Sequence, residues 1–454
     1  MISKDIQSSI KTKVIEDIRS SLKINVIEDI QSSLKTNVIE DIQYLYDRGM
    51  FAMKLGLENI ENLLKHGNID IEKLKAIHIA GTNGKGSTSN MISQIFTANG
   101  YKTGLFTSPH LVSFNERIRI DGEMISDGEL SSLINELKGG IEKYNCTFFE
   151  ASTAMAFKYF IEKKVDVAII EVGLGGRLDS TNIITPILSV ITGIDIDHTA
   201  HLGNSIVEIA REKAGIIKEE IPVVFNVDKL SAEKVITSTA KRKKAPLHKV
   251  DKKGCNFKGD KVEFTLNNEF VSSNFNLQGN YQKTNFRTAL KSLQIVNVSF
   301  PVKKIETVNA IENFVIKGRM ETVSTEPFIL IDAAHNIQGL NELKKYIDQI
   351  KVDRIHLVTG TVKDKDHVGT IKKILSFKAI KYFVGSNNSR ILPIEKIKTE
   401  CNKFNIDENV SYYENVVEGY KAALKNYQVG DLIIITGSHF ILGDFLENFE
   451  SSEK

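Results

Sequence analysis

Short apolar runs rich in β-branched residues alternate with longer helix-compatible stretches from residue 75 onward. Strands that are buried on both faces read as such continuous runs, and helices must cover those faces, so the alternation predicts an α/β fold with parallel sheets. The expected strands are 76–80, 165–172, 187–194 and 222–227, and then a second set at 328–332, 354–359, 380–384 and 431–436. We also expect an antiparallel edge strand at 262–266.

The chain has 454 residues, which is too long for one hydrophobic core. The two sets of strands separate near residues 298–318, where a proline precedes a short helical stretch and Gly318 follows it. An internal repeat opens the chain: residues 14–25 recur as 26–37, with apolar side chains every four positions, which suits a helix. We therefore predict a helical extension over 1–37, a larger domain over 38–318 and a smaller domain over 319–454.

Charge and composition exclude several classes of protein. The 59 basic and 57 acidic residues leave a net charge of +2, without the basic excess typical of a nucleic-acid-binding protein. No uncharged apolar run approaches the roughly 18 residues of a membrane-spanning helix. Cys146, Cys255 and Cys401 show no metal-binding spacing, and three is an odd number for a disulfide framework. We expect a monomer in the reducing cytoplasm, with neither nucleic acid nor a membrane as its partner.

A glycine-rich turn with one lysine follows the first strand, because residues 77–87 read IHIAGTNGKGS. Backbone N–H groups of such a turn can surround phosphate oxygens, and a helix N-terminus adds its partial positive charge. Lys85 would reach the terminal phosphates. The strict P-loop pattern is not met, since Gly86 stands where serine or threonine is expected. Taken alone, the segment favours phosphate binding over a plain turn but leaves both open.

The residue sequence of this turn is more informative than its glycine content alone. GTNGKGS at 81–87 resembles the ATP loop of the Mur ligase superfamily. Further motifs follow in the order of that superfamily, namely FTSPHL at 106–111, NERI at 115–118, EVGLGGRLD at 171–179, DH at 197–198 and REKAG at 211–215. Within the superfamily, the chain is similar to the folylpolyglutamate synthase and dihydrofolate synthase family from about residue 38 to about residue 445.

This resemblance implies a fold and a reaction. The fold is an N-terminal P-loop ATPase-like Mur ligase domain with a parallel sheet, joined to a smaller Rossmann-like α/β domain at the C-terminus. The implied reaction uses ATP and Mg²⁺ to join L-glutamate to the carboxylate of a folate, and also of 7,8-dihydropteroate, through an acyl phosphate. A cell-wall Mur ligase and a non-catalytic nucleotide-binding module remain as alternatives. The motifs at 107–110 and 171–177 favour the folate branch.

Glu171 ends an apolar strand, where a carboxylate is costly unless it is paired or bound to a metal. Ligands of open α/β sheets bind at this carboxyl end of the strands. The resemblance implies a site for two Mg²⁺ ions with the ligands Ser108, Glu171, His198 and Lys213. It also implies a carbamylated Lys213, because the superfamily's lysine often carries carbon dioxide. The residues themselves leave open a capping glutamate, a turn serine, a hydrogen-bonded histidine and a surface lysine paired with Glu208 or Glu212.

The remaining site residues are implied motif by motif. Catalysis is implied for Lys85, His198 and Lys213. ATP binding is implied for Thr82, Asn83, Gly84, Lys85, Gly86, Ser87, Asn285, Arg319 and Asp332. Folate binding is implied for Thr147, Phe148, Phe149, Glu150, Leu178, Asp179 and Ser180, and one of the two phenylalanines is expected in the core.

Several C-terminal positions depart from the family pattern. The departures are Tyr281 in place of a histidine, Lys317 in place of a proline, Ala333 in place of a glycine, Ile337 in place of a proline, and an unusual histidine at His439. None of them removes a charged group that the implied mechanism uses.

Overall fold

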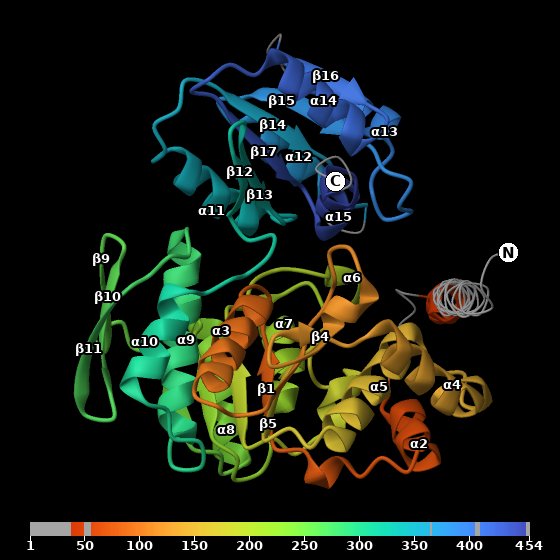
Figure 1. Ribbon diagram of the computed structural model, residues 1–454, viewed down its shortest axis with the longest axis vertical. Helices are drawn as coiled ribbons and strands as arrows, with labels where there is room; N and C mark the ends of the chain where they lie inside the picture. Colours follow the sequence, from red (N-terminus) through yellow and green to blue (C-terminus); the bar gives the residue numbers. More distant parts are fainter. Residues whose placement is uncertain (1–37, 50–55, 364–365, 405–408, 451–454) are drawn as a thin grey trace, which may run out of the picture. The chain divides into compact units, whose positions relative to one another are not determined.

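Two mainly parallel sheets, one small antiparallel sheet and a group of helices account for the residues that the computed structural model describes, which are 38–49, 56–363, 366–404 and 409–450 (Figure 1). These residues divide into two compact units. The helical unit contains residues 38–49, 58–69 and 125–159, and the sheet unit contains the other described residues. The expected extension at 1–37 lies outside the described residues and stays a prediction.

Amphipathic helices build the helical unit: residues 38–47, α2 (Glu58–His66), α4 (Asp127–Lys143) and most of α5 (Phe148–Glu162). The buried residues of α4 recur at three- and four-residue spacing from Leu130 to Leu137, which places them on one face of the helix. Gly140 lets α2 approach closely, because a Cβ atom there would lie 2.6 Å from Cδ2 of His66.

The sheet unit contains an eight-stranded sheet with the order β4-β3-β2-β5-β1-β6-β7-β8. Its strands are β1 (Ala76–Ala80), β2 (Thr103–Phe106), β3 (Ile118–Ile120), β4 (Glu123–Met124), β5 (Val167–Glu171), β6 (Leu188–Ile191), β7 (Val223–Phe225) and β8 (Leu247–Lys249). The strands from β2 to β8 in this order are parallel, and β3 and β4 add an antiparallel edge. The expected parallel sheet is therefore confirmed.

Helices cover both faces of this sheet. Ile79 and Val224 point to the face that packs on α3 (Lys85–Ala98), α9 (Asn280–Val296) and α10 (Lys304–Glu312). Their neighbours Ala80 and Phe225 belong to the other face, where α7 (Ile206–Lys213) and α8 (Leu230–Arg242) contribute to the core. Successive side chains of a strand point to opposite faces of the sheet. Because apolar residues of these strands stand at positions of both orientations, alternate residues pack into the two hydrophobic cores on either side.

The antiparallel strand expected at 262–266 is present, but it is not an edge. β10 (Lys261–Leu266) lies between β9 (Cys255–Lys258) and β11 (Glu269–Asn274) in a separate three-stranded sheet. Asn267 and Asn268 both have positive φ angles, 52° and 66°, and form the tight turn between β10 and β11. Two consecutive residues with positive φ angles are typical of the turn in a two-residue β-hairpin. The Asn-Asn pair is therefore the sequence signal from which β11, which was not predicted, could have been identified.

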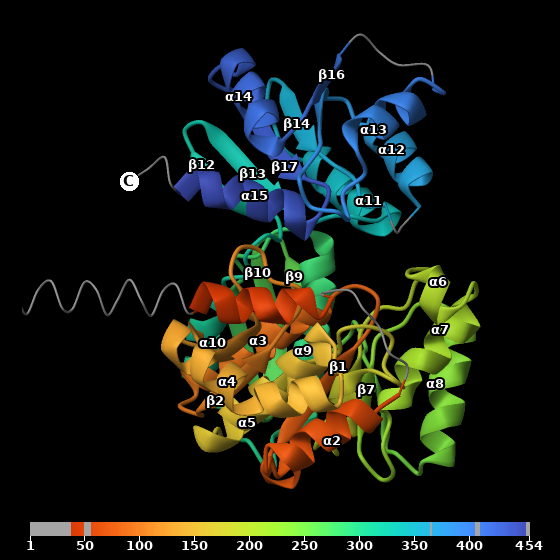
Figure 2. The ribbon, with the colours of Figure 1, turned by 90° about the vertical axis from the view of Figure 1, so that its right-hand side faces the viewer.

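A six-stranded sheet with the order β12-β13-β17-β14-β15-β16 forms the C-terminal part. Its strands are β12 (Glu321–Thr325), β13 (Phe328–Asp332), β14 (Ile355–Thr359), β15 (Ile380–Val384), β16 (Val410–Tyr413) and β17 (Leu432–Thr436). All of its neighbouring strands are parallel except β12 and β13. Figure 2 shows α11 (Ile337–Ile347), α12 (His367–Leu375) and α13 (Ile394–Cys401) on one face, and α14 (Val416–Asn426) and α15 (His439–Glu450) on the other.

This layering confirms the expected Rossmann-like class of the C-terminal part. The helix expected before Gly318 is α10, and Gly318 itself has a φ of +67°. The domain boundary between residues 318 and 319 stays a prediction. No helix in the described part of the chain is long and apolar enough to cross a membrane. Cys146, Cys255 and Cys401 are buried and unbonded to one another.

Candidate functional site

A cavity of about 480 Å³ lies in the sheet unit, at the carboxyl ends of the strands. The glycine-rich loop of residues 81–87, called the phosphate loop below, borders it, as do the end of β5 and the end of β13. Every residue predicted to bind ATP or metal lines this cavity: Thr82, Asn83, Gly84, Lys85, Gly86, Ser87, Ser108, Glu171, His198, Lys213, Asn285, Arg319 and Asp332. None of the residues predicted to bind folate lines it.

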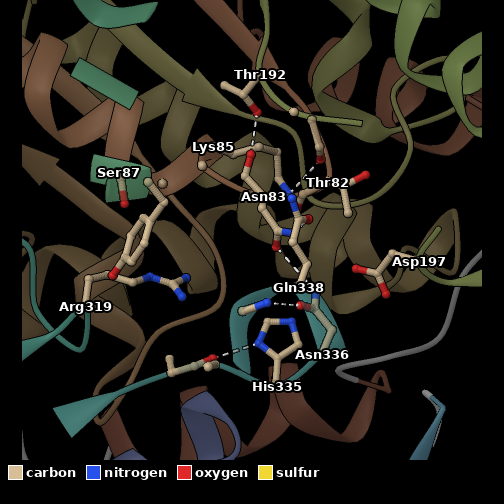
Figure 3. A pocket seen from close by; sticks show the side chains of 18 of the residues that line it. Thr82, Asn83, Lys85, Ser87, Thr192, Asp197, Arg319, His335, Asn336 and Gln338 are labelled. Atoms are coloured by element: carbon tan, nitrogen blue, oxygen red, sulfur yellow. Dashed lines mark hydrogen bonds between the residues drawn. The ribbon is translucent and has the colours of Figure 1, made fainter. Parts of the chain in front are cut away.

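The phosphate loop lies between β1, whose five residues are all buried, and α3, which begins at Lys85. Its backbone is anchored to the residues after β6, because Thr82 N–H donates to Gly193 O at 2.7 Å and Thr192 Oγ1 donates to Asn83 O at 2.7 Å (Figure 3). Nζ of Lys85 donates to Gly81 O at 3.0 Å. The first turn of α3 holds no acidic residue, so the helix end and Lys85 present positive charge that suits an anion.

Two glycines of the loop allow close approaches that a side chain would block. Gly84 has a φ of +85°, and a Cβ atom there would lie 2.3 Å from Oδ1 of Asn285 on α9. A Cβ atom at Gly86 would lie 3.4 Å from Oε2 of Glu171. Gly86, which breaks the strict P-loop pattern, thus brings the start of α3 against a carboxylate.

Glu171 is the last residue of β5 and is only 4% exposed. Its Oε2 accepts a hydrogen bond from Ser108 N–H at 3.1 Å, in the turn after β2. Burial raises the pKa of Glu171, and the nearby charge of Lys85, the Ser108 N–H and the charge of Arg319 oppose this shift. A carboxylate that is costly to bury and lies among donors and cations can be stabilised further by a divalent ion.

His198 lies in an unusual backbone conformation. It precedes the short helix α6 (Thr199–Leu202) with φ 49° and ψ 45°, in the left-handed region. Its backbone N–H donates to Oδ1 of Asp197 at 2.9 Å, and its Nε2 lies 3.9 Å from Oδ2 of the same residue. A non-glycine residue held in this region is uncommon, and such outliers concentrate at functional sites.

Lys213 is buried at the C-terminal end of α7, with 3% of the residue exposed. Its Nζ donates to Gly81 O in the phosphate loop at 3.0 Å. Neither acidic neighbour pairs with it as the surface alternative requires, because Glu212 binds Arg177 at 2.9 Å and Glu208 caps α7 through Ser205. The alternative of a surface lysine is therefore wrong.

Asp332 ends β13 and is 4% exposed. Its Oδ2 accepts hydrogen bonds from Met320 N–H at 3.0 Å and from the Tyr281 hydroxyl at 3.2 Å, and its Oδ1 accepts one from Ala334 N–H at 2.9 Å. Burial raises the pKa of Asp332, against the charge of Arg319. Burial also raises the pKa of Tyr281, so this hydroxyl keeps its proton and remains a donor.

The residues 147–150, predicted to bind folate, lie at the start of α5 in the helical unit. Phe148 is 1% exposed and stacks on Tyr46 with ring centroids 5.5 Å apart, whereas Phe149 is partly exposed. Oε2 of Glu150 accepts hydrogen bonds from the N–H and hydroxyl of Thr147, at 2.7 and 2.9 Å. Its buried Oε1 has no hydrogen-bond partner among the described residues. Phe148 is thus the expected core residue, and Glu150 keeps one acceptor unused.

The residues 178–180 lie in the sheet unit, where Asp179 organises its own loop. Its Oδ2 accepts from Leu174 N–H at 2.8 Å, and its Oδ1 accepts from Thr181 N–H at 3.0 Å. The hydroxyl of Thr181 lies 2.8 Å from Nε2 of His78 in β1, and burial lowers the pKa of His78 to about 3. An uncharged histidine therefore ties this loop to the strand before the phosphate loop.

Sequence reasoning missed several polar residues of the cavity. The side chain of Asn83 accepts a hydrogen bond from Asn336 at 3.4 Å and donates one to Gln338, and Figure 3 shows these side chains meeting. Thr192 anchors the loop from the far end of β6. The signal for Thr192 is its place one residue after a strand, at the edge where ligands bind. The hydrogen bond between Asn83 and Gln338 joins residues 255 positions apart, so no local sequence pattern indicates it.

The part of the chain that the structure describes holds no cluster of three or more His, Cys, Asp and Glu side chains with metal-cage geometry. The predicted set contains only two residues of these types, Glu171 and His198. Mg²⁺ commonly binds through one or two carboxylates, with water and substrate phosphates as the other ligands. The buried carboxylate of Glu171, beside the glycine-rich loop at Gly86, fits that chemistry.

Profiles of known families match most of the sheet unit. The Mur ligase middle domain matches residues 79–293, and the glutamate ligase domain of Mur ligases matches residues 318–439. The chain is 33% identical over 422 residues to the dihydrofolate synthase/folylpolyglutamate synthase of Bacillus subtilis, covering 88% of this chain and 96% of that protein. The chain belongs to the dihydrofolate synthase/folylpolyglutamate synthase family of Mur ligases.

Other members of this family agree with the assignment. A folylpolyglutamate synthase of Lacticaseibacillus casei is 34% identical over 328 residues, covering 68% of this chain and 76% of that protein. The structure of folylpolyglutamate synthase from Thermotoga maritima aligns with a TM-score of 0.79 at 31% identity, over 92% of this chain and 98% of that one. Escherichia coli FolC in complex with DHPP and ADP aligns with a TM-score of 0.82 at 27% identity, over 92% and 98%.

Proposed function

We propose that this chain is an ATP-dependent ligase that joins L-glutamate to the carboxylate of a folate and of 7,8-dihydropteroate. One observation carries the proposal: a single cavity gathers the phosphate loop, the buried Glu171 and Arg319. Relatives with the names of both activities, and a neighbour solved with DHPP and ADP, support the choice of acid and nucleotide. Within the cavity, Lys85 and Arg319 stabilise the negative charge of the transferred phosphoryl group.

We infer that Ser108, Glu171, His198 and Lys213 hold Mg²⁺ at the phosphates. The ion, when bound, neutralises phosphate charge. Ser108 and Glu171 are already joined by a hydrogen bond of 3.1 Å, and Gly86 keeps the loop backbone beside Glu171. The chain's own task is to hold these ligands in place, and the buried strand β5 supplies a rigid base for Glu171.

We infer that Lys213 works as a carbamate. In that reaction the ammonium group first loses one proton. The neutral amine then adds to the carbon of carbon dioxide and loses a second proton, so that a positive group is exchanged for a negative one. Burial of Lys213 favours the uncharged amine that reacts. Its place against Gly81 O puts the modified group beside the phosphate loop, where a negative oxygen ligand for a metal is useful.

We infer that residues 147–150, at the start of α5 in the helical unit, bind the folate. A contribution of residues 178–180, in the sheet unit, is a separate inference. Phe149 offers a partly exposed aromatic face on which a flat heterocycle can stack. The unused Oε1 of Glu150 can accept a hydrogen bond from a ring N–H group. Asp179 serves by holding Leu178 and Ser180 in a defined loop, since its own oxygens bind Leu174 and Thr181.

The function is tested by measuring phosphate release from ATP with dihydropteroate, tetrahydrofolate or a muramyl peptide, each with and without L-glutamate. We expect release only when a pteroate-type acid and glutamate are both present. Release that requires the muramyl peptide would identify a cell-wall ligase instead. Nucleotide binding without any glutamate-dependent release would identify a nucleotide-binding module and contradict the proposal.

Phe149→Ala is expected to weaken binding of the folate substrate roughly three- to tenfold while leaving ATP binding unchanged, because one stacking face is lost. Titration of the folate and of ATP, each followed by calorimetry, checks this. Phe148→Ala is the matched control, since a buried phenylalanine costs about 3–5 kcal/mol of stability when truncated and its loss should weaken both ligands together. Equal losses for both ligands in Phe149→Ala would assign Phe149 to the core.

A further inference from the structure

The backbone that carries Arg319 is held rigidly on both sides. Gly318 and Met320 have φ angles of +67° and +48°, and the second is uncommon for a residue with a side chain. Gly318 O accepts a hydrogen bond from Ala333 N–H at 2.9 Å, and Met320 N–H donates to Asp332 at 3.0 Å. These two hydrogen bonds to the end of β13 therefore fix the direction in which the Arg319 side chain projects from the backbone.

The side chain of Arg319 is held by a histidine. One terminal nitrogen of its guanidinium lies 3.1 Å from Nε2 of His439, the first residue of α15. A guanidinium can only donate, so Nε2 of His439 accepts, and the ring is uncharged with its proton on Nδ1. The salt bridges of the described residues include none of Arg319, although its charge acts on the carboxyl groups of Glu171 and Asp332 and opposes the rise of their pKa.

Neighbouring residues fix the position of His439. Ser438 precedes it and caps α15 by accepting a hydrogen bond from Ile441 N–H at 3.1 Å. The ring of His335 lies beside the ring of His439, with centroids 5.6 Å apart, and His335 Nδ1 donates to Ala333 O at 2.8 Å. In Figure 3, His335 and Arg319 border the same cavity.

A neutral acceptor suits Arg319 better than a carboxylate would. Arginine loses rotamer entropy when its side chain is fixed in one direction, and an ordered partner removes that cost before a ligand arrives. A carboxylate partner would also neutralise the charge that an anionic ligand needs, whereas an uncharged imidazole orients the guanidinium and leaves its charge available. We propose that His439 is a positioning residue, which orients Arg319 toward the phosphates of ATP. The inference rests on the proposed function.

The test compares substitutions that remove or keep the acceptor. His439→Leu removes it, His439→Ala is a second acceptor-free variant, and His439→Gln places an amide oxygen near the former Nε2. We expect both acceptor-free variants to lose roughly ten- to a hundredfold in kcat, as for a lost hydrogen bond to a charged group, with the KM for glutamate unchanged. His439→Gln should stay within about threefold of the parent, since an acceptor is restored. His367→Leu is the matched control, because His367 also begins a helix, α12, and should leave activity unchanged.

A double-mutant cycle with Arg319→Leu separates the two levels of the proposal. If His439 acts through Arg319, His439→Leu should have no further effect on kcat in the Arg319→Leu background. Additive losses, or a normal kcat for both acceptor-free variants while Arg319→Leu is impaired, would overturn the role of His439 alone. A normal kcat for Arg319→Leu would instead contradict the phosphate role of Arg319 in the proposed function.

Discussion

Lys85→Ala is expected to lower the turnover of ATP by roughly 10²–10³-fold or more, because it removes the positive charge that we propose acts on the phosphoryl group. The fold should survive, since Nζ of Lys85 donates only to the carbonyls of Gly81 and Thr82 in the structure. The free energy of unfolding should change by no more than about 1.5 kcal/mol. Phosphate release and a urea titration of the same preparation measure the two effects.

The control for Lys85 is Lys403→Ala, which removes the same charge from an exposed pair with Glu400 at 2.7 Å. Exposed pairs of this kind contribute at most about 1 kcal/mol, so this variant should keep its activity and its stability. Near-normal turnover in Lys85→Ala would remove the phosphate-loop interpretation, because the fold of the loop is held by other residues, such as Thr82 and Thr192.

Lys213→Ala is expected to lose roughly a hundredfold or more in kcat, because the proposed carbamate, a negative ligand beside the phosphate loop, would disappear with the side chain. Acetate should restore part of the activity, since a small carboxylate can enter the vacated space. Removal of carbon dioxide should lower the activity of the unsubstituted protein reversibly. A carbamate signal from isotopically labelled carbon dioxide, recorded on the native protein by magnetic resonance, provides a readout that does not depend on activity.

Lys218 offers the matched control for this experiment. Lys218 is half-buried, whereas Lys213 is fully buried. Burial lowers the pKa of the Lys218 amine, and its Nζ donates to Asn182 O at 2.7 Å outside the cavity. The carbamate signal should persist in Lys218→Ala and vanish in Lys213→Ala. If the unsubstituted protein shows no such signal and Lys213→Ala remains fully active, the carbamate proposal is wrong. If Lys213→Ala unfolds, the labelled spectrum of the unsubstituted protein still decides the question.

The class of fold and the positions of most parallel strands could be predicted from local sequence patterns, but the order of the strands in the sheets and the central strand β2 were not predicted. β1, β13 and β15 begin and end at the predicted residues, because each is a buried run of apolar residues with polar or glycine-rich turns beside it. Local patterns also indicated the phosphate loop, which directly follows an apolar strand, and Glu171, which ends one, whereas Asp332 was implied only by the family resemblance. Local patterns were less informative at the short strands β9 and β16, which have few fully buried residues.

Contacts between segments that are distant in sequence became apparent only from the three-dimensional fold. Lys213 reads equally well as a surface residue of a helix, and it is the fold that buries it against Gly81, 132 positions away in sequence. The partnership of Arg319 with His439 spans 120 positions, and the contact of Gly84 with Asn285 is likewise made by distant segments. The physical reason is that period and composition specify which residues must be buried or turned, whereas the pairing of side chains from different elements depends on how sheets and helices pack.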